Sequence, residues 1–227
     1  RGGRHRRAHR QGLPTPAGRQ QDPGHFRALR HPATLRRRHL AGHPGRCPHP
    51  GVTRVVHPYF GTDANGPIRD AAVWRAFAQD LNQAGAIARA AGFRFGYHNH
   101  HNEFLPLSDG SGRRGFDVLT KTADPRLVHL EVDLYWSWRG AADPVDVIRA
   151  HRGRVQQFHV KDMNINSGFT DPGTGLIDFS RIFAESKTAG VVEYIVERDD
   201  AGTGERTPAD SLDTAAVGYQ FLRNIRF

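Results

Sequence analysis

Histidine, acidic and lysine residues recur where short apolar stretches end in the second half of the chain. In chain order they are His57, His98, His100, Asp133, His159, Lys161, Glu197 and Asp199. Imidazole and carboxylate groups bind divalent cations, and the same groups transfer protons. The pattern predicts a metal centre with acid–base chemistry, although each residue taken singly is also typical of a hydrogen-bonded structural group or a helix cap.

Strands must position these residues, because apolar stretches alternate with helical patterns along the chain. We predict strands over residues 52–59, 93–98, 127–134, 155–160 and 191–196, and helices over 70–90, 115–122, 143–150, 179–188 and 210–225. Gly92 ends the first helix, and Pro144 takes the first position of the third. Strands that alternate with helices indicate an α/β protein with a parallel sheet. No G-x-G-x-x-G motif follows a strand, which disfavours a dinucleotide-binding fold.

Side chains alternate along a strand, so each strand has an inner and an outer face. Phe93, Phe95 and Tyr97 suit packing under helices, which leaves the alternate residues inside. The residues expected inside are Gly96, His98, His100, His129, Glu131, Asp133, His159, Lys161, Glu197 and Asp199. A (β/α)₈ TIM barrel gathers catalytic groups at the C-terminal ends of its strands. Glu103, just past its strand, can reach the same rim.

Residues 1–50 differ in composition from residues 51–227, and we place a domain boundary between them. The first segment has 12 Arg, no Lys and one acidic residue, so its net charge is +11. The whole chain has a net charge of +9, and residues 51–227 therefore carry −2. It has no Val or Ile, and we expect it to be mostly disordered, with a short helix at most over 25–41. A nucleic-acid-binding arm, a transit peptide and out-of-frame translation of a GC-rich gene are the three hypotheses, and the last is favoured.

Composition also limits the partners and the location of the protein. A single cysteine, Cys47, excludes an intramolecular disulfide framework and a cysteine-based zinc cage. No apolar run approaches the roughly 18 residues of a membrane span. We expect a cytoplasmic protein with a small-molecule sugar substrate, no membrane and no specific nucleic acid, and homo-oligomerisation stays open.

Six strings between about Gly51 and Phe227 resemble the sugar phosphate isomerase/epimerase family. They are YHNHHNEF (97–104), DPRLV (124–128), EVDLYW (131–136), HVKD (159–162), GTGLIDF (173–179) and VERD (196–199). The resemblance implies a xylose-isomerase-like TIM barrel in which the strand at 52–59 is the fourth of eight. About five C-terminal βα units can then be recognised in the sequence. Residues 1–50 do not resemble the first three βα units of such a barrel, so the barrel is expected to be incomplete.

The resemblance also implies a divalent metal ion (Mn, Zn or Mg) held by Glu103, Asp133, His159 and Glu197. The first ligand stays open, because His98 or His100 lies where other members of the superfamily carry the ligand carboxylate.

The implied reaction is isomerisation or epimerisation of a sugar or sugar phosphate by proton transfer next to a carbonyl, through an enediolate. Glu197 would be ligand and base, with Glu103 as its partner on the opposite face. Lys161 would neutralise the oxyanion, unless it forms an ion pair with Asp162 or Glu197.

Two further roles follow for side chains that contact the sugar: His98 and His100 would bind hydroxyls, and Trp136 would stack on the ring or simply pack. The Gly173–Gly175 loop is a phosphate cradle or, as we favour, a plain turn.

Other functions compete with this one. A polyol or keto-sugar dehydratase shares the first step and then expels hydroxide. An endonuclease at abasic sites in DNA is disfavoured by the −2 charge of residues 51–227. A metal-free pseudoenzyme or a truncated, inactive gene product is the non-enzyme hypothesis. Residues 1–50 cannot supply three Val/Ile-rich buried strands, so we expect no turnover from the chain on its own.

Overall fold

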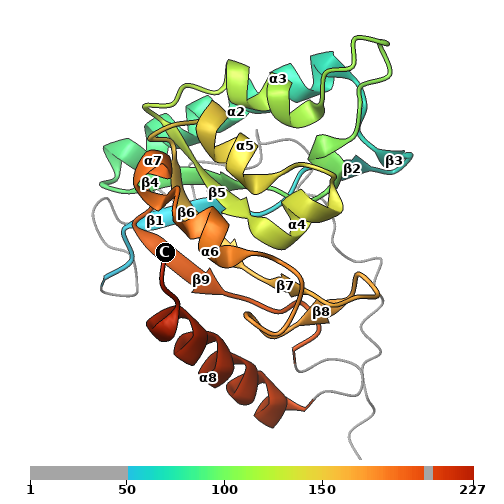
Figure 1. Cartoon of the computed structure of the whole chain (residues 1–227). Coiled ribbons are helices and arrows are strands. Elements are labelled where there is room, and N and C mark those ends of the chain that lie inside the picture. Colours follow the sequence, from blue (N-terminus) through green and yellow to red (C-terminus); the bar gives the residue numbers. More distant parts are fainter. Residues whose placement is uncertain (1–50, 202–206) are drawn as a thin grey trace, which may run out of the picture.

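The computed structural model describes residues 51–201 and 207–227, and a five-stranded parallel sheet forms their centre (Figure 1). The strands are β1 (Arg54–His57), β4 (Arg94–His98), β5 (Val128–Asp133), β6 (Val155–Val160) and β9 (Glu193–Val196). They pair in chain order, as the sequence predicts, and form a half-barrel sheet. The disorder expected in residues 1–50 and the short helix at 25–41 lie outside the described residues.

Helices follow the strands and cover one face of the sheet. They are α2 (Ala71–Ala90), α3 (Gly115–Thr122), α4 (Leu134–Arg139), α5 (Pro144–Ala150), α6 (Phe179–Phe183), α7 (Ser186–Ala189) and α8 (Pro208–Asn224). The Asp70 carboxylate accepts from Ala72 N and starts α2, and Asp143 caps α5 in the same way. Two features differ from prediction: α4 follows β5 directly, and the helix expected over 179–188 is divided into α6 and α7.

Five further short elements lie beyond the carboxyl ends of strands and were not predicted. Strands β2 (Thr62–Asp63) and β3 (Gly66–Pro67) form one antiparallel pair after β1. Strands β7 (Asp162–Met163) and β8 (Phe169–Thr170) form another after β6. A 3₁₀ turn, η2 (Asn102–Phe104), follows β4. Pairs this short show no period-2 pattern, so the sequence gives no signal for them.

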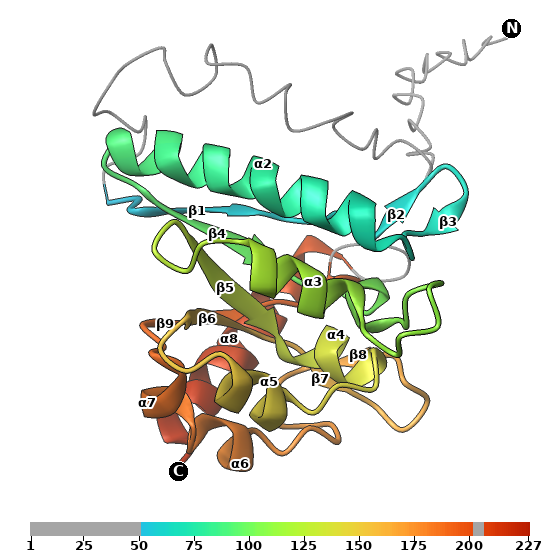
Figure 2. The ribbon, with the colours of Figure 1, turned by 90° about the horizontal axis from the view of Figure 1, so that it is seen from above.

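The apolar core lies between the sheet and its helices, whereas the inner face of the sheet is polar. One cluster joins α2 and α3 to β4 around the buried side chains of Trp74 and Phe77, and a second packs α5, α6 and α7 on β6 around Phe158. Figure 2 shows α2 lying along β1 and β4. Barrel interiors usually hold branched apolar residues, so buried imidazole, amide and carboxylate groups on this inner face indicate a functional surface.

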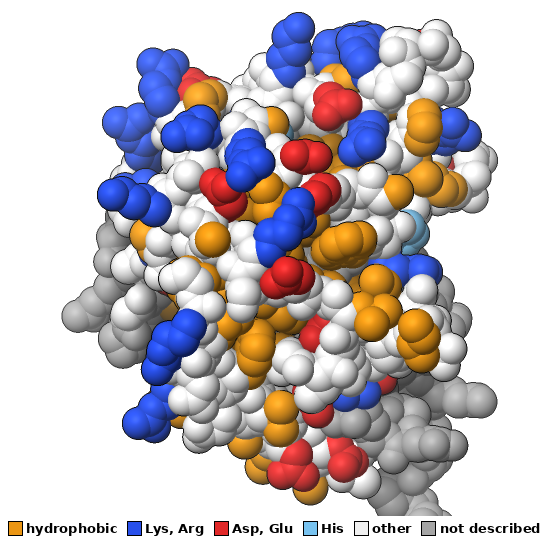
Figure 3. Space-filling view, in the orientation of Figure 1, with side chains coloured by type: hydrophobic (Ala, Val, Ile, Leu, Met, Phe, Trp, Pro, Cys, Tyr) orange, Lys and Arg blue, Asp and Glu red, His pale blue; other side chains and the backbone are white. Residues whose placement is uncertain are grey.

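Basic and acidic side chains are interspersed on the face of the molecule seen in Figure 3. Two exposed ion pairs join the outer helices: Arg149 with Glu185, and Arg181 with Asp143. Paired charges of this kind offer no continuous basic track for a nucleic-acid backbone on that face. Among the described residues, no helix has the length and apolar character that crossing a bilayer requires.

Candidate metal and acid–base site

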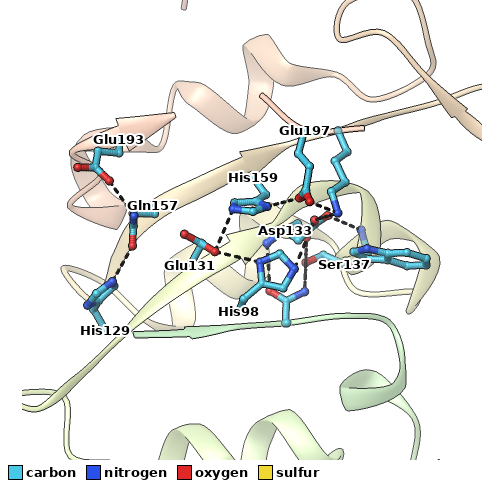
Figure 4. Close-up of polar contacts among 12 residues, drawn as sticks. His98, His129, Glu131, Asp133, Ser137, Gln157, His159, Glu193 and Glu197 are labelled. Atoms are coloured by element: carbon cyan, nitrogen blue, oxygen red, sulfur yellow. Dashed lines mark hydrogen bonds and ion pairs between the residues drawn. The ribbon is translucent and has the colours of Figure 1, made fainter. Parts of the chain in front are cut away.

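Glu131 lies at the centre of a buried polar cluster near the carboxyl ends of β4, β5 and β6 (Figure 4). Its Oε1 atom is 3.1 Å from His98 Nδ1 and 3.0 Å from His159 Nε2. The three residues come from neighbouring strands, and their ligand atoms lie within 4.8 Å of one another. They therefore form one group that could hold a metal ion.

A second group of this kind shares His159 and continues toward β9. His159 Nδ1 lies 2.5 Å from Glu197 Oε2, and Asp133 completes the group. Asp133 is fully buried, and its Oδ1 atom accepts from Trp136 N at the start of α4. Its Oδ2 atom is buried without a hydrogen-bond partner and faces Lys161 Nζ at 3.0 Å. This buried oxygen has basic partners nearby, Lys161 and, at 3.7 Å, His98 Nε2, and a carboxylate oxygen of this kind can serve as a ligand for a divalent cation.

Lys161 follows β6 and brings a positive charge to the same site. Its side chain is 2% exposed, and its Nζ atom lies 3.0 Å from Asp133 Oδ2, 2.9 Å from Glu197 Oε2 and 2.6 Å from Asp199 Oδ1. It also stands 5.8 Å above the ring of Trp136. The ion pair with Glu197 is thus present, and Asp133 and Asp199 add two contacts that were not expected.

Opposite charges keep the site ionised in spite of burial. Burial alone would raise the pKa of Glu131, but hydrogen bonds from His159 and His98 lower that pKa to about 2. Burial alone would likewise raise the pKa of Glu197, but His159 and Lys161 lower that pKa to about 2. The pKa of His159 rises to about 9, because its two carboxylate partners outweigh burial. Near neutral pH both carboxylates are charged and His159 carries a proton.

A row of hydrogen bonds lies beside these groups on the inner face, nearer the amino ends of the strands. His129 Nε2 is 2.7 Å from Gln157 Oε1, and Gln157 Nε2 donates to Glu193 Oε2 at 2.7 Å (Figure 4). Pairing shifts by one residue between Leu130 and Glu131, because Leu130 pairs with Val155 and Glu131 with Gln157. This bulge lets Gln157 and His159 share the inner face with the residues of β5.

Glu103 lies apart from both groups, unlike the other three expected ligands. It stands in η2, is fully buried, and accepts a 2.7 Å hydrogen bond from the hydroxyl of Tyr97. Tyr97 packs on the helix side of β4, where its ring meets Phe77 and His57. Burial raises the pKa of Glu103. His57, the first residue of the strand-end series, is on this outer side too.

Glu131, which was not among the expected ligands, joins His98 and His159, whereas Glu103 lies outside both groups of ligand atoms. Alternation along β5 had placed Glu131 on the inner face with Asp133, and that was the available signal. The family resemblance instead implies the carboxylate after β4, Glu103, as the first ligand.

Of the residues expected to bind substrate, His98 belongs to the cluster, and His100 and Trp136 lie beside it. The ring of His100 is 4.8 Å from that of His98 and 5.3 Å from that of Trp136. His100 Nδ1 and Trp136 Nε1 are both buried without a hydrogen-bond partner. Burial, together with the charge of neighbouring His98 and Lys161, lowers the pKa of His100 to about 3, so its imidazole is neutral. Neutral groups of this kind can bind hydroxyls.

The glycine-rich loop is a turn built around a buried carboxylate. Asp162 Oδ2 accepts from the N–H groups of Gly173 and Gly175, each at 2.9 Å. Its Oδ1 atom accepts from Met163 N and Ile177 N. These N–H groups already serve Asp162, so the loop does not offer them to a phosphate.

Solved structures with a similar fold include several sugar-converting enzymes. A sugar phosphate isomerase/epimerase from Parabacteroides distasonis has a TM-score of 0.63 and 26% identity, over 76% of this chain and 58% of that one. The IolI protein, solved with a zinc atom, has a TM-score of 0.53 over 75% of this chain and 64% of that one. At 16% identity the second shows a likeness of fold alone.

Curated relatives resemble the chain at lower coverage. The inosose dehydratase of Geobacillus kaustophilus is 28% identical over 130 residues, 49% of this chain and 41% of that enzyme. The inosose dehydratase of Clostridium botulinum (strain Alaska E43) is 26% identical over 171 residues, 66% of this chain and 54% of that enzyme. The chain thus spans about half the length of the curated relatives it matches.

The family comparison covers most of the sequence. The xylose isomerase-like TIM barrel family matches residues 24–224, a range that holds all five parallel strands and both groups of ligand atoms. The chain therefore belongs to the xylose isomerase-like TIM barrel family.

Proposed function

We propose that the protein transfers a proton at a carbon next to the carbonyl of a small polyhydroxylated substrate, and so isomerises or epimerises a sugar. The observation that carries this proposal is the convergence of Asp133, His159 and Glu197 with Lys161 at the carboxyl ends of the strands. Active sites of TIM-barrel enzymes lie at this end of the barrel.

Asp133, His159 and Glu197 would hold a divalent cation, because their ligand atoms lie within 4.8 Å of one another and the buried Oδ2 atom of Asp133 has a cationic group, Lys161, beside it. Two carboxylates and one imidazole suit Mn²⁺, Zn²⁺ or Mg²⁺. Such an ion, when bound, would polarise the substrate carbonyl. Glu103 has no role in the proposal, because it lies outside both groups and is bonded to Tyr97.

Glu197 is the proposed base. Its side chain is 40% exposed, so a substrate can reach it, and its low pKa keeps it ionised. Lys161 lies 2.9 Å from the same carboxylate and would stabilise negative charge on the substrate oxygen. His100, with its unpaired Nδ1 atom, would bind a hydroxyl, and the ring of Trp136 would contact the carbon skeleton.

Dehydration is the second candidate, and the inosose dehydratases among the relatives favour it. The first step is the same removal of a proton beside the carbonyl. Loss of hydroxide from the next carbon then follows in place of reprotonation. The same residues serve both reactions, so the products must distinguish them.

The test is product analysis in D₂O with Mn²⁺, offering the protein an inosose and, separately, a ketohexose. Isomerisation or epimerisation yields a sugar of unchanged formula with deuterium at one carbon. Dehydration yields an unsaturated or diketo product that has lost water. Failure to bring deuterium into either substrate or product, by a folded and metal-loaded protein, would contradict both candidates.

A further inference from the structure

Lys161 makes contact with two of the atoms that would hold a metal ion. Its Nζ atom lies 3.0 Å from Asp133 Oδ2 and 2.9 Å from Glu197 Oε2, and both residues belong to the same candidate group. The ammonium group and a divalent cation are both positively charged, and both would bind the same carboxylate oxygens. They therefore compete for the site, and their repulsion is strong at this degree of burial.

Asp199 gives Lys161 a third partner, and this partner is outside both candidate groups. The distance from Lys161 Nζ to Asp199 Oδ1 is 2.6 Å, the shortest of the three. Asp199 comes two residues after Glu197, in the turn that follows β9, and its side chain is 30% exposed. Part of the ammonium charge is thus compensated by a carboxylate that the metal does not need.

We propose that Asp199 is a positioning residue: it holds the ammonium group of Lys161 and thereby strengthens binding of a divalent cation to Asp133, His159 and Glu197. Without Asp199, only the carboxylates of Asp133 and Glu197 would compensate the positive charge of Lys161. The inference rests on the metal site of the proposed function. It goes further by giving Asp199 and Lys161 opposite effects on metal affinity.

The experiment measures Mn²⁺ affinity of the full chain by calorimetric titration at fixed pH and ionic strength. The variants are Lys161→Met, Asp199→Asn and the double substitution. Lys121→Met and Asp146→Asn are controls, because they change the charge equally at exposed sites on α3 and α5. We expect Lys161→Met to bind Mn²⁺ about tenfold more tightly or better, and Asp199→Asn to bind it several-fold more weakly. The controls should match the unsubstituted protein.

The double substitution separates this mechanism from a simple effect of charge. If Asp199 acts through Lys161, Asp199→Asn has little effect once Lys161 is replaced. If Asp199 acts only as a negative charge near the metal, the Asp199→Asn substitution weakens Mn²⁺ binding equally with Lys161 present and with Lys161 replaced. Asp199→Glu keeps the partner for Lys161 and should restore the affinity.

Thermal unfolding in EDTA supplies a readout that needs no metal. Lys161→Met leaves Asp133 and Glu197 without their ammonium partner, so its melting temperature should fall, and Mn²⁺ should raise it more than in the unsubstituted protein. If that variant does not fold in EDTA, Asp199→Asn is compared with Asp199→Glu instead, and equal Mn²⁺ affinities of these two variants would overturn the inference.

Unchanged or weaker Mn²⁺ binding by Lys161→Met would overturn the inference, as would an Asp199→Asn effect of equal size in both backgrounds. These results leave the proposed metal site intact. Absence of Mn²⁺ binding by every folded variant would overturn the inference and the metal site together.

Discussion

Arg54 Nη1 lies 3.2 Å from Glu193 Oε1, although Arg54 stands on β1 and Glu193 on β9, the two outermost strands of the sheet. In a flat sheet these strands would be roughly 19 Å apart, at about 4.8 Å per strand. The sheet must therefore curl until the inner faces of its edges meet. This curvature turns the side chains of separate strands toward one another.

The row of hydrogen bonds beside the candidate site should contribute to stability. Replacement of Gln157 by Leu removes the partner of buried His129, whereas half-exposed Glu193 can turn to water. We expect the free energy of unfolding to fall by about 1–3 kcal/mol, measured by urea denaturation. Gln79→Leu, on the exposed face of α2, is the matched control and should change it little. Equal stabilities for the two variants would show that the row is not needed.

Asp133→Asn should reduce metal binding while the helix cap remains. The amide oxygen can still accept from Trp136 N, so α4 keeps its start, but the buried charge is lost. Metal affinity should fall by at least the roughly 10–100-fold that loss of an outer-shell partner costs. Elemental analysis checks this, with Asp143→Asn, another capping aspartate, as the control. Wild-type metal content in Asp133→Asn would refute the site.

Glu197→Gln should stop exchange of the substrate C–H with solvent deuterium. The amide keeps the shape of the side chain but cannot take a proton, so exchange should slow by about 10²-fold or more. Proton NMR in D₂O measures the exchange, and Glu193→Gln, at the start of β9 four residues before Glu197, controls for the change in charge. Undiminished exchange would assign the base to another carboxylate, with Glu131 the nearest to His159.

Asp162→Asn should loosen the loop after β8. The NH₂ of the amide would face the backbone N–H groups of Gly173 and Gly175, and two donors cannot form a hydrogen bond with each other. We expect a loss of about 1–3 kcal/mol and faster hydrogen exchange at both amides. Asp109→Asn, in an exposed loop, should leave these amides protected. Unchanged exchange in Asp162→Asn would mean that the loop is held by other contacts.

Much of the fold could be predicted because its signals are local. Apolar spacing located α2 within one residue, and Asp143 with Pro144 marked the start of α5 correctly. Helix α4 was missed, because its six aromatic-rich residues follow β5 without a break and show no helical period. Its cap, Asp133, is one of the residues for which the sequence allows a helix cap as well as a metal ligand.

The sequence by itself determined which face of each strand Glu131, Asp133 and His159 occupy, because alternation follows from backbone geometry within one strand. Only the tertiary structure decided which of these side chains meet. That depends on the bulge between β5 and β6, on the turn that sends Glu103 toward Tyr97, and on the curl that joins Arg54 to Glu193. The bulge and the curl arise from pairing between separate strands, and the contact of Glu103 with Tyr97 arises from a turn without a periodic pattern, so no local pattern predicts these features.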